Sequence, residues 1–319
     1  MSVSDSKHNL KEVQNLSRPT ATESEQASSD EEEEEEEGPP ARRASNLLLG
    51  FCLFLALASL ALHVLGSVAA VGSIWVDSLF ALCFAALTVA NLSRRLSFQN
   101  ALGAGGAAFV VIFIILSLAS RNKLLAGIVF TDKLGLRFFG LFPIVLPFLL
   151  TGALLASREA ARVMMRPWRR SSYYGYWIIL LASVLFLGFD FLLESFATQI
   201  ANWWSYPQAL PESGMFLPFG VPILVHLVWF IVGLVTLILA SAWLLKRKIW
   251  FEPLGWHVPA PYLLLCGWLT AANIIGQQWL SVLVGAVYLI LVIGLSAHGI
   301  RVAQERLSAR LAASEESES

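Results

Sequence analysis

Residues 189–229 read FDFLLESFATQIANWWSYPQALPESGMFLPFGVPILVHLVW. Apolar runs begin and end this segment, and a connection rich in aromatic and polar residues joins them. Three ionisable side chains, Asp190, Glu194 and His226, lie within the apolar runs. Long apolar runs predict membrane-spanning helices, and ionisable groups inside a membrane are costly. The segment therefore predicts two membrane helices, and the three ionisable side chains are candidates for a functional site.

The composition of the whole chain is that of a membrane protein. Of its 319 residues, 56% are hydrophobic and 14% are charged, and the mean hydropathy is +0.66. A soluble domain carries roughly a quarter charged residues. Cys52, Cys83 and Cys266 are each isolated in an apolar run, which favours core residues over a disulfide or metal framework. These features predict an all-α, polytopic membrane helical bundle, and nothing in them indicates nucleic-acid binding.

Eight apolar runs are long enough to cross about 30 Å of hydrocarbon as helices, with little to spare in the shorter ones. Lipid offers the backbone no hydrogen-bond partners, so such segments are predicted to be helical. The runs are residues 47–70, 74–92, 101–119, 141–157, 173–194, 219–245, 261–277 and 281–300. They predict a transmembrane domain of about eight helices over residues 46–300.

Both ends of the chain are polar. Residues 1–45 include seven consecutive glutamates at 31–37, and they are predicted to be a disordered acidic tail because they have too few apolar residues to fold. No basic segment leads into an early apolar core, so we expect no cleaved signal peptide. Residues 301–319 are predicted to be a cytoplasmic tail, with a short basic amphipathic helix followed by an acidic end.

Lysine and arginine are unequally distributed among the connections. With the N-terminus inside, the inner segments near the membrane carry 15 of them and the outer connections carry 4. Because cytoplasmic segments of membrane proteins carry such an excess, the sequence predicts a multi-pass protein of the cell membrane with both termini in the cytoplasm. In this topology the polar groups of the apolar runs gather in the outer half of the bundle, where Asp190, Glu194 and His226 are joined by His63 and Asp77.

Asp190 and Glu194 are four residues apart, so they share one face of a helix. Two carboxylates in a low-dielectric site do not readily ionise together, and we expect the pair to retain a proton near neutral pH. Such a pair suits general acid catalysis, with the second group as a base or an orienting group. The alternative is that Glu194 lies at the membrane interface and pairs with Arg137 or Lys133.

The aromatic and histidine residues allow two interpretations. Trp203, Trp204 and Tyr206 fit an interfacial aromatic belt, or they face inward and stabilise a cation through their ring faces. His226 and His63 are either proton relays or hydrogen-bond donors between packed helices. No histidine or carboxylate cluster has the spacing of metal ligands, so we expect no metal.

Two segments of the sequence carry a family resemblance. The first begins at Gly127 and continues through Thr131-Asp132-Lys133, Gly135, Gly140, Pro143 and Pro147. The second comprises Asp190-x-x-x-Glu194-x-x-Ala197, Trp203-Trp204, Phe219-Gly220-Val221-Pro222 and Trp229. In the order and spacing of these residues, the chain resembles the carotenoid biosynthesis membrane protein family, which includes bisanhydrobacterioruberin hydratase and the gamma-carotene 1'-hydratases. The resemblance covers residues 100–300, without the first two predicted helices, and Ser195 and Val225 replace a proline and an asparagine of the family pattern.

The resemblance implies an integral-membrane hydratase, a lyase without a cofactor, that adds water to the terminal 1,2 double bond of an acyclic carotenoid end. Asp190 or Glu194 would be the acid, and the partner carboxylate, Asp132 or His226 would take the proton of the water. The residues expected to contact the substrate are Trp203, Trp204, Gly220, Pro222 and Trp229. The implied partners are a carotenoid or another long polyprenoid, membrane lipid and other enzymes of the carotenoid pathway.

Two interpretations without catalysis remain open. A protein that binds or transports a lipid or polyprenoid would use Asp190 and Glu194 for proton coupling. A structural subunit would instead pair both acids with a partner helix. Transporters commonly contain inverted repeats, and the two halves of this chain match neither in motif nor in hydropathy, which disfavours a transporter.

Overall fold

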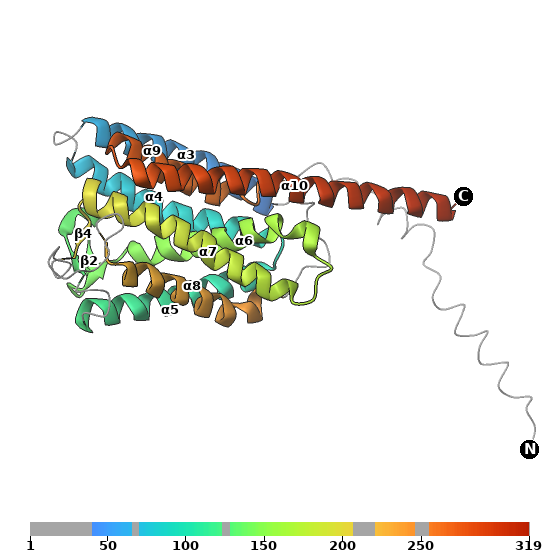
Figure 1. The fold of residues 1–319 in the computed structure, drawn as a ribbon, viewed down its shortest axis with the longest axis horizontal. Coiled ribbons are helices and arrows are strands. Elements are labelled where there is room, and N and C mark those ends of the chain that lie inside the picture. Colours follow the sequence, from blue (N-terminus) through green and yellow to red (C-terminus); the bar gives the residue numbers. More distant parts are fainter. Residues whose placement is uncertain (1–39, 66–69, 123–127, 207–220, 246–254, 319) are drawn as a thin grey trace, which may run out of the picture. The chain divides into compact units, whose positions relative to one another are not determined.

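Eight α-helices make up most of the computed structural model, which describes residues 40–65, 70–122, 128–206, 221–245 and 255–318 (Figure 1). They are α3 (Pro40–Leu65), α4 (Ala70–Ser93), α5 (Phe98–Asn122), α6 (Leu146–Met164), α7 (Tyr174–Ser195), α8 (Ile223–Leu244), α9 (Ala260–Ile275) and α10 (Trp279–Glu318). Each overlaps one predicted apolar run, so the predicted all-α bundle is confirmed. Residues 44–319 form one compact unit. Residues 1–39 of the predicted acidic tail lie outside the described residues.

Six helices of the described chain are long and apolar enough to cross a membrane: α3, α4, α5, α7, α8 and α10. Of the other two, α9 is apolar but has 16 residues, and α6 carries Arg158, Glu159 and Arg162 near its end. Large apolar side chains point outward from the bundle, such as Phe54, which is 63% exposed, and Ile290, which is 70% exposed. The chain is therefore a multi-pass membrane protein whose outer surface suits lipid.

Helix α6 forms the centre of the bundle. Of its 19 residues, 17 are buried, and it packs against α4, α5, α7 and α10. At Gly152 a Cβ atom would lie 2.9 Å from the ring of Phe84 and 3.2 Å from the Cα atom of Ala85. Such small residues let helices approach closely in lipid, where van der Waals packing holds them together. Helix α7, which carries Asp190 and Glu194, packs against both α6 and α8.

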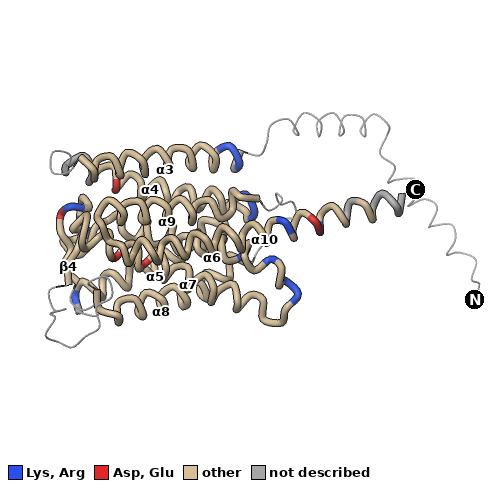
Figure 2. Tube along the Cα trace, turned by 45° about the horizontal axis from the view of Figure 1, so that its top comes forward, with Lys and Arg blue, Asp and Glu red and all other residues tan. Residues whose placement is uncertain are grey.

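Charge is distributed unevenly along the bundle. Figure 2 shows lysines and arginines gathered at the end of the bundle where α6 ends and α7 begins. Asp190 and Glu194 lie in the last two turns of α7, which starts at that basic end. The basic end is the one predicted to face the cytoplasm, and the orientation itself remains a prediction.

Two short antiparallel strand pairs lie near the C-terminal end of α7. Strand β1 (Val129–Phe130) pairs with β4 (Trp204–Ser205), and β2 (Arg137–Phe138) pairs with β3 (Phe142–Pro143). The turn between β2 and β3 uses Gly140 at φ 72°, a conformation that glycine adopts without steric cost. The Thr131 hydroxyl donates to the Asn202 carbonyl at 2.6 Å. These contacts join the segment after α5 to the segment after α7, where the candidate site lies.

Two helices differ from the predicted boundaries. Helix α10 continues for 40 residues to Glu318, which corrects the expectation of a separate short helix within residues 301–319. That segment contains neither glycine nor proline and is rich in Ala, Leu, Arg and Glu, which are strong helix formers. Helix α6 starts at Leu146 rather than at residue 141 because residues 142 and 143 form β3, and Pro143 lacks the N–H group that a helix interior requires.

Candidate active site

Two carboxylates lie inside the bundle on one face of α7. Asp190 and Glu194 are each 2% exposed, and they are one helical turn apart. Their neighbours along the helix, such as Phe189 and Leu193, are buried apolar residues. A carboxylate in such surroundings requires polar partners, and the two acids have different ones.

Asp190 pairs with His226 of α8. The Nδ1 atom of His226 lies 2.6 Å from Oδ2 of Asp190, and both side chains are buried. Pro222 precedes α8 with an extended backbone, so His226 lies in the first turn of that helix. The Phe191 ring packs against the imidazole, with 4.4 Å between the ring centroids. The structure thus brings together two of the residues that the sequence identified.

Glu194 accepts hydrogen bonds from two aromatic side chains. The Trp204 Nε1 atom donates to Oε2 at 2.8 Å, and the Tyr206 hydroxyl donates to Oε1 at 2.8 Å. Burial, together with the nearby Glu194, raises the pKa of Tyr206 well above its ordinary value, so the hydroxyl retains the proton that it donates. Arg137 contacts Asp132 instead, at 2.8 Å. The alternative in which Glu194 lies at the interface and pairs with Arg137 is therefore wrong.

A widened turn at the end of α7 positions the donors to Glu194. Residues Phe196–Ile200 form a π-helical turn, a feature found frequently at functional sites. Asn202 follows in the left-handed conformation at φ 51°, which asparagine adopts more readily than most residues. The Trp203 amide then donates to the Ala197 carbonyl at 2.7 Å. The chain reverses at this point, and the reversal returns the next residues to the side of Glu194.

Aromatic rings surround the carboxylates. Trp203 and Trp204 are 2% and 3% exposed, so the interpretation as an interfacial belt is wrong for both. The Phe196 ring packs edge-on against Trp203, with centroids 5.0 Å apart, and against Trp268, with centroids 5.3 Å apart. Trp204 packs against Phe130 of β1 at 5.9 Å. The site therefore combines buried acids with buried aromatic ring surfaces.

The other residues expected to contact the substrate lie along α8 or before it. Trp229 is 4% exposed and lies almost one turn beyond His226 on α8. Pro222 is buried at the start of that helix. Gly220 lies outside the described residues. The structure thus places Trp229 on the helix that carries His226, and Pro222 immediately before that helix.

Asp132 is not brought to the acids. It begins a 3-10 turn, Asp132–Leu134, in which the Thr131 side chain accepts a hydrogen bond from the Lys133 amide. The Asp132 side chain is 89% exposed and contacts Arg137. The sequence places Asp132 at the correct end of the bundle, but the direction of its side chain depends on the geometry of this turn.

Another buried carboxylate adjoins the same aromatic cluster. Asp77 of α4 is 2% exposed and accepts a hydrogen bond from Ser59 at 2.6 Å. The His63 Nε2 atom lies 3.4 Å from Asp77, and the His63 ring packs edge-on against Phe196 at 5.2 Å. Trp268 donates to the Ser59 hydroxyl at 3.3 Å. His63 and Asp77 therefore lie near the acids, as the sequence predicted, but they form a cluster of their own.

Among the residues of these clusters that were not identified from the sequence are Ser59, Phe196 and Trp268. Ser59 and His63 are four residues apart in an apolar run, and this shared helix face was a usable signal. Phe196 and Trp268 are indistinguishable in sequence from ordinary packing residues. Among the described residues, no three His, Cys, Asp or Glu side chains group as metal ligands.

The fold and the site together define a multi-pass helical membrane protein with paired carboxylates and aromatic rings in its interior. The chain belongs to the carotenoid biosynthesis protein family, whose model matches residues 74–292. The match begins within α4, so it extends further than the resemblance predicted from the sequence, which left out the first two helices. Membership gives the protein a role in carotenoid biosynthesis and indicates a carotenoid-related substrate. No curated protein and no solved structure is significantly similar to the chain.

Proposed function

We propose that the protein is a carotenoid hydratase that adds water across the terminal 1,2 double bond of an acyclic carotenoid end. The observation that carries this proposal is the pair of Asp190 and Glu194, buried one turn apart with different polar partners. Membership of the carotenoid biosynthesis family supports a polyene substrate. An acid held in an apolar, aromatic interior is what the hydration of an unactivated alkene requires.

The proposed reaction is an acid-catalysed addition. A proton is transferred to C2 of the trisubstituted alkene, which leaves a tertiary cation at C1. Water forms the new C–O bond at C1 and gives a proton to a base, so one molecule of water is added and no electrons are gained or lost. Exclusion of bulk water strengthens the electrostatic interactions in the site and limits side reactions, and aromatic ring faces stabilise the cation.

The different partners of the two acids suggest how the roles divide. Glu194 accepts hydrogen bonds from two neutral donors that hold both of its oxygens in place, so we assign it to stabilise the cation and to take the proton of the attacking water. We assign proton donation to Asp190, which His226 orients. Proton exchange between the two carboxylates, one helical turn apart, restores the site. We assign two roles, stabilisation of the cation and contact with the end of the polyene, to Trp203, Trp204 and Trp229.

Pigment analysis tests the proposal. The chain is expressed in a host that makes lycopene or gamma-carotene, and the molecular masses of the extracted pigments are determined by mass spectrometry. We expect a product heavier by one molecule of water. Asp190→Asn should abolish this product because an amide is not a useful proton donor. Asp132→Asn is the matched control and should retain the product, since it makes the same change at a side chain that is 89% exposed.

Two results would count against the proposed function or the roles of its residues. If Asp190→Asn and Glu194→Gln both left hydration intact, neither acid would be catalytic. If the wild-type chain inserted well but left lycopene and gamma-carotene unchanged, the interpretation as a protein that binds or transports a polyprenoid would gain support.

A further inference from the structure

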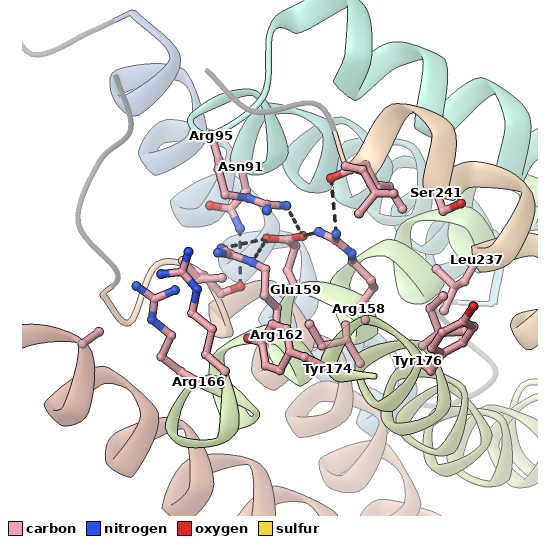
Figure 3. Close-up of a pocket in the computed structure, with 18 of the residues that line it drawn as sticks. Asn91, Arg95, Arg158, Glu159, Arg162, Arg166, Tyr174, Tyr176, Leu237 and Ser241 are labelled. Atoms are coloured by element: carbon pink, nitrogen blue, oxygen red, sulfur yellow. Dashed lines mark hydrogen bonds and ion pairs between the residues drawn. The ribbon is translucent and has the colours of Figure 1, made fainter. Parts of the chain in front are cut away.

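A cavity of about 1190 Å³ lies at the basic end of the bundle (Figure 3). Its walls come from the last turns of α4, α6 and α8, the first turns of α7, and α10. The residue of α7 that lines it nearest to the acids is Ile179, which precedes Asp190 by about 16 Å of helix. The cavity is therefore separate from the candidate active site.

Positive charge dominates the walls of this cavity. Eight arginines line it, and Glu159 is the only carboxylate among the residues that do so in the described chain. Glu159 contacts Arg95 at 2.7 Å, Arg162 at 3.1 Å, and Arg158. Figure 3 shows these three side chains converging on Glu159. Eight guanidinium groups therefore line the cavity together with one carboxylate.

Arg166, Arg169 and Arg170 hold much of that excess charge. They lie in or just after the 3-10 turn Arg166–Trp168 that follows α6, and none contacts a carboxylate of the described chain. The Arg166 Nε atom is buried without a hydrogen-bond partner. Burial and the charge of neighbouring Arg169 lower the pKa of Arg166 below its usual value. The positive-inside rule places arginines on the cytoplasmic side, but it does not account for a half-buried Arg166 whose Nε atom is buried without a hydrogen-bond partner.

An apolar wall completes the cavity. Ile178 and Ile179 of α7, together with Leu237 and Ile238 of α8, line it. In Figure 3, Leu237 lies on the opposite side of the cavity from Arg166. The volume of about 1190 Å³ is larger than a single oxyanion fills. The cavity therefore offers guanidinium groups at one side and an apolar surface of helix at the other.

We propose that this cavity binds a phosphate oxyanion carried by an amphiphile, with the phosphate at Arg166, Arg169 and Arg170 and the apolar tail along α7 and α8. Planar guanidinium groups bind phosphate oxygens through paired, charge-assisted hydrogen bonds. A soluble phosphate and the head of a membrane amphiphile share this chemistry, and the apolar wall favours the amphiphile. The proposal does not depend on the hydratase activity.

Binding to the purified full-length chain in detergent tests the proposal, with hexyl phosphate and inorganic phosphate as probes in isothermal titration calorimetry. We expect hexyl phosphate to bind at least about tenfold more tightly, because two buried methylene groups are sufficient for that difference. Equal affinities would show that the tail does not contact the apolar wall, and they would overturn the proposal that the ligand is an amphiphile. If neither probe bound, the proposal that the cavity binds a phosphate group would be overturned.

Matched variants separate the cavity from general electrostatic attraction. The triple variant Arg166→Gln, Arg169→Gln and Arg170→Gln should bind hexyl phosphate about tenfold more weakly or worse, because charge-assisted hydrogen bonds are lost. The control triple variant removes the same charge from exposed arginines that do not line the cavity, Arg42, Arg43 and Arg301, and should bind as the wild type does. Equal weakening in both would contradict a specific site.

A second variant keeps the test informative if the triple variant does not fold. Arg169→Glu combined with Arg170→Glu changes only exposed side chains and reverses their charge. We expect this double variant to lose hexyl phosphate binding while its melting temperature stays close to that of the wild type. Undiminished binding in a folded double variant would overturn the placement of the phosphate.

Discussion

Glu194 and Asp190 lie one turn apart on α7, yet the side chains around them differ in chemistry. Trp204 and Tyr206 are neutral donors that both bind Glu194, whereas His226 can itself carry the proton that it shares with Asp190. The difference separates the roles of two carboxylates that are alike in burial. Each role therefore predicts its own response to substitution.

Tyr206→Phe removes one donor to Glu194 without changing the shape of the ring. A hydrogen bond to a charged group contributes about 1.5–3 kcal/mol, so the yield of hydrated pigment should fall about tenfold or more. Tyr288→Phe is the control, since that hydroxyl donates to the Val184 carbonyl, away from the acids. Equal yields from the wild type and Tyr206→Phe would show that this hydrogen bond does not support catalysis.

Substitution of His226 separates orientation of Asp190 from proton transfer. In His226→Asn the side-chain amide can still donate to Asp190, so we expect a melting temperature near that of the wild type and a large loss of hydrated pigment. His226→Leu removes the partner of a buried acid, which costs about 3–5 kcal/mol where the acid is charged, and should lower the melting temperature clearly. Full activity of His226→Asn would exclude a proton-transfer role for His226.

The sequence predicted some of these side chains and not others for physical reasons. Asp190 and Glu194 stand out because their spacing and apolar surroundings are both visible in one helix. The hydrogen bonds of Trp204 and Tyr206 to Glu194 depend on a π-helical turn and a left-handed Asn202, and neither has a distinct sequence pattern. Asp132 was misplaced relative to the acids because only the fold of its loop sets the direction of its side chain.

Among the elements, the helices were predictable and the strands were not. Apolar runs of membrane length require helices, so each run has its helix. The strands have two residues each, too few to show an alternating pattern. The length of α10 shows that a change from apolar to charged residues does not end a helix, since no glycine or proline interrupts residues 301–318.

The contact between α10 and α6 predicts a sensitive position at Gly299. A Cβ atom there would lie 2.0 Å from the Val163 carbonyl oxygen, so Gly299→Ala must force the two helices apart. We expect a loss of stability of about 1–3 kcal/mol, measured as a lower melting temperature in detergent. Gly294→Ala is the control on the same helix. It has no atom within 4 Å of its Cβ position and should be neutral or stabilising. Equal melting temperatures for the two variants would contradict the close packing.

Across the whole molecule, the two ends of the bundle differ in chemistry. The acids and aromatic rings lie toward one end, and the arginine-lined cavity lies at the other. The uneven distribution of lysine and arginine was visible in the sequence, because it depends only on the order of the apolar runs. The cavity was not, because its arginines converge in space from three separate segments of the chain.

The predicted orientation is tested by labelling single introduced cysteines in intact cells. Lys133→Cys and Ser172→Cys change exposed residues near opposite ends of the bundle, and Cys52 and Cys266 of the native chain are buried. A membrane-impermeant maleimide should label the cysteine at position 133 in intact cells and the one at position 172 only after permeabilisation. The reverse pattern would overturn the orientation with both termini in the cytoplasm.

Hydration by the purified protein is the most direct test of the proposed enzyme. The full-length chain in detergent is incubated with lycopene and, separately, with gamma-carotene in water enriched in oxygen-18, and the pigments are analysed by mass spectrometry. We predict a product that has gained one molecule of labelled water, formed by the wild type and by Asp132→Asn but not by Asp190→Asn. Unlabelled, unchanged lycopene and gamma-carotene after incubation with the folded wild-type protein would contradict the hydratase.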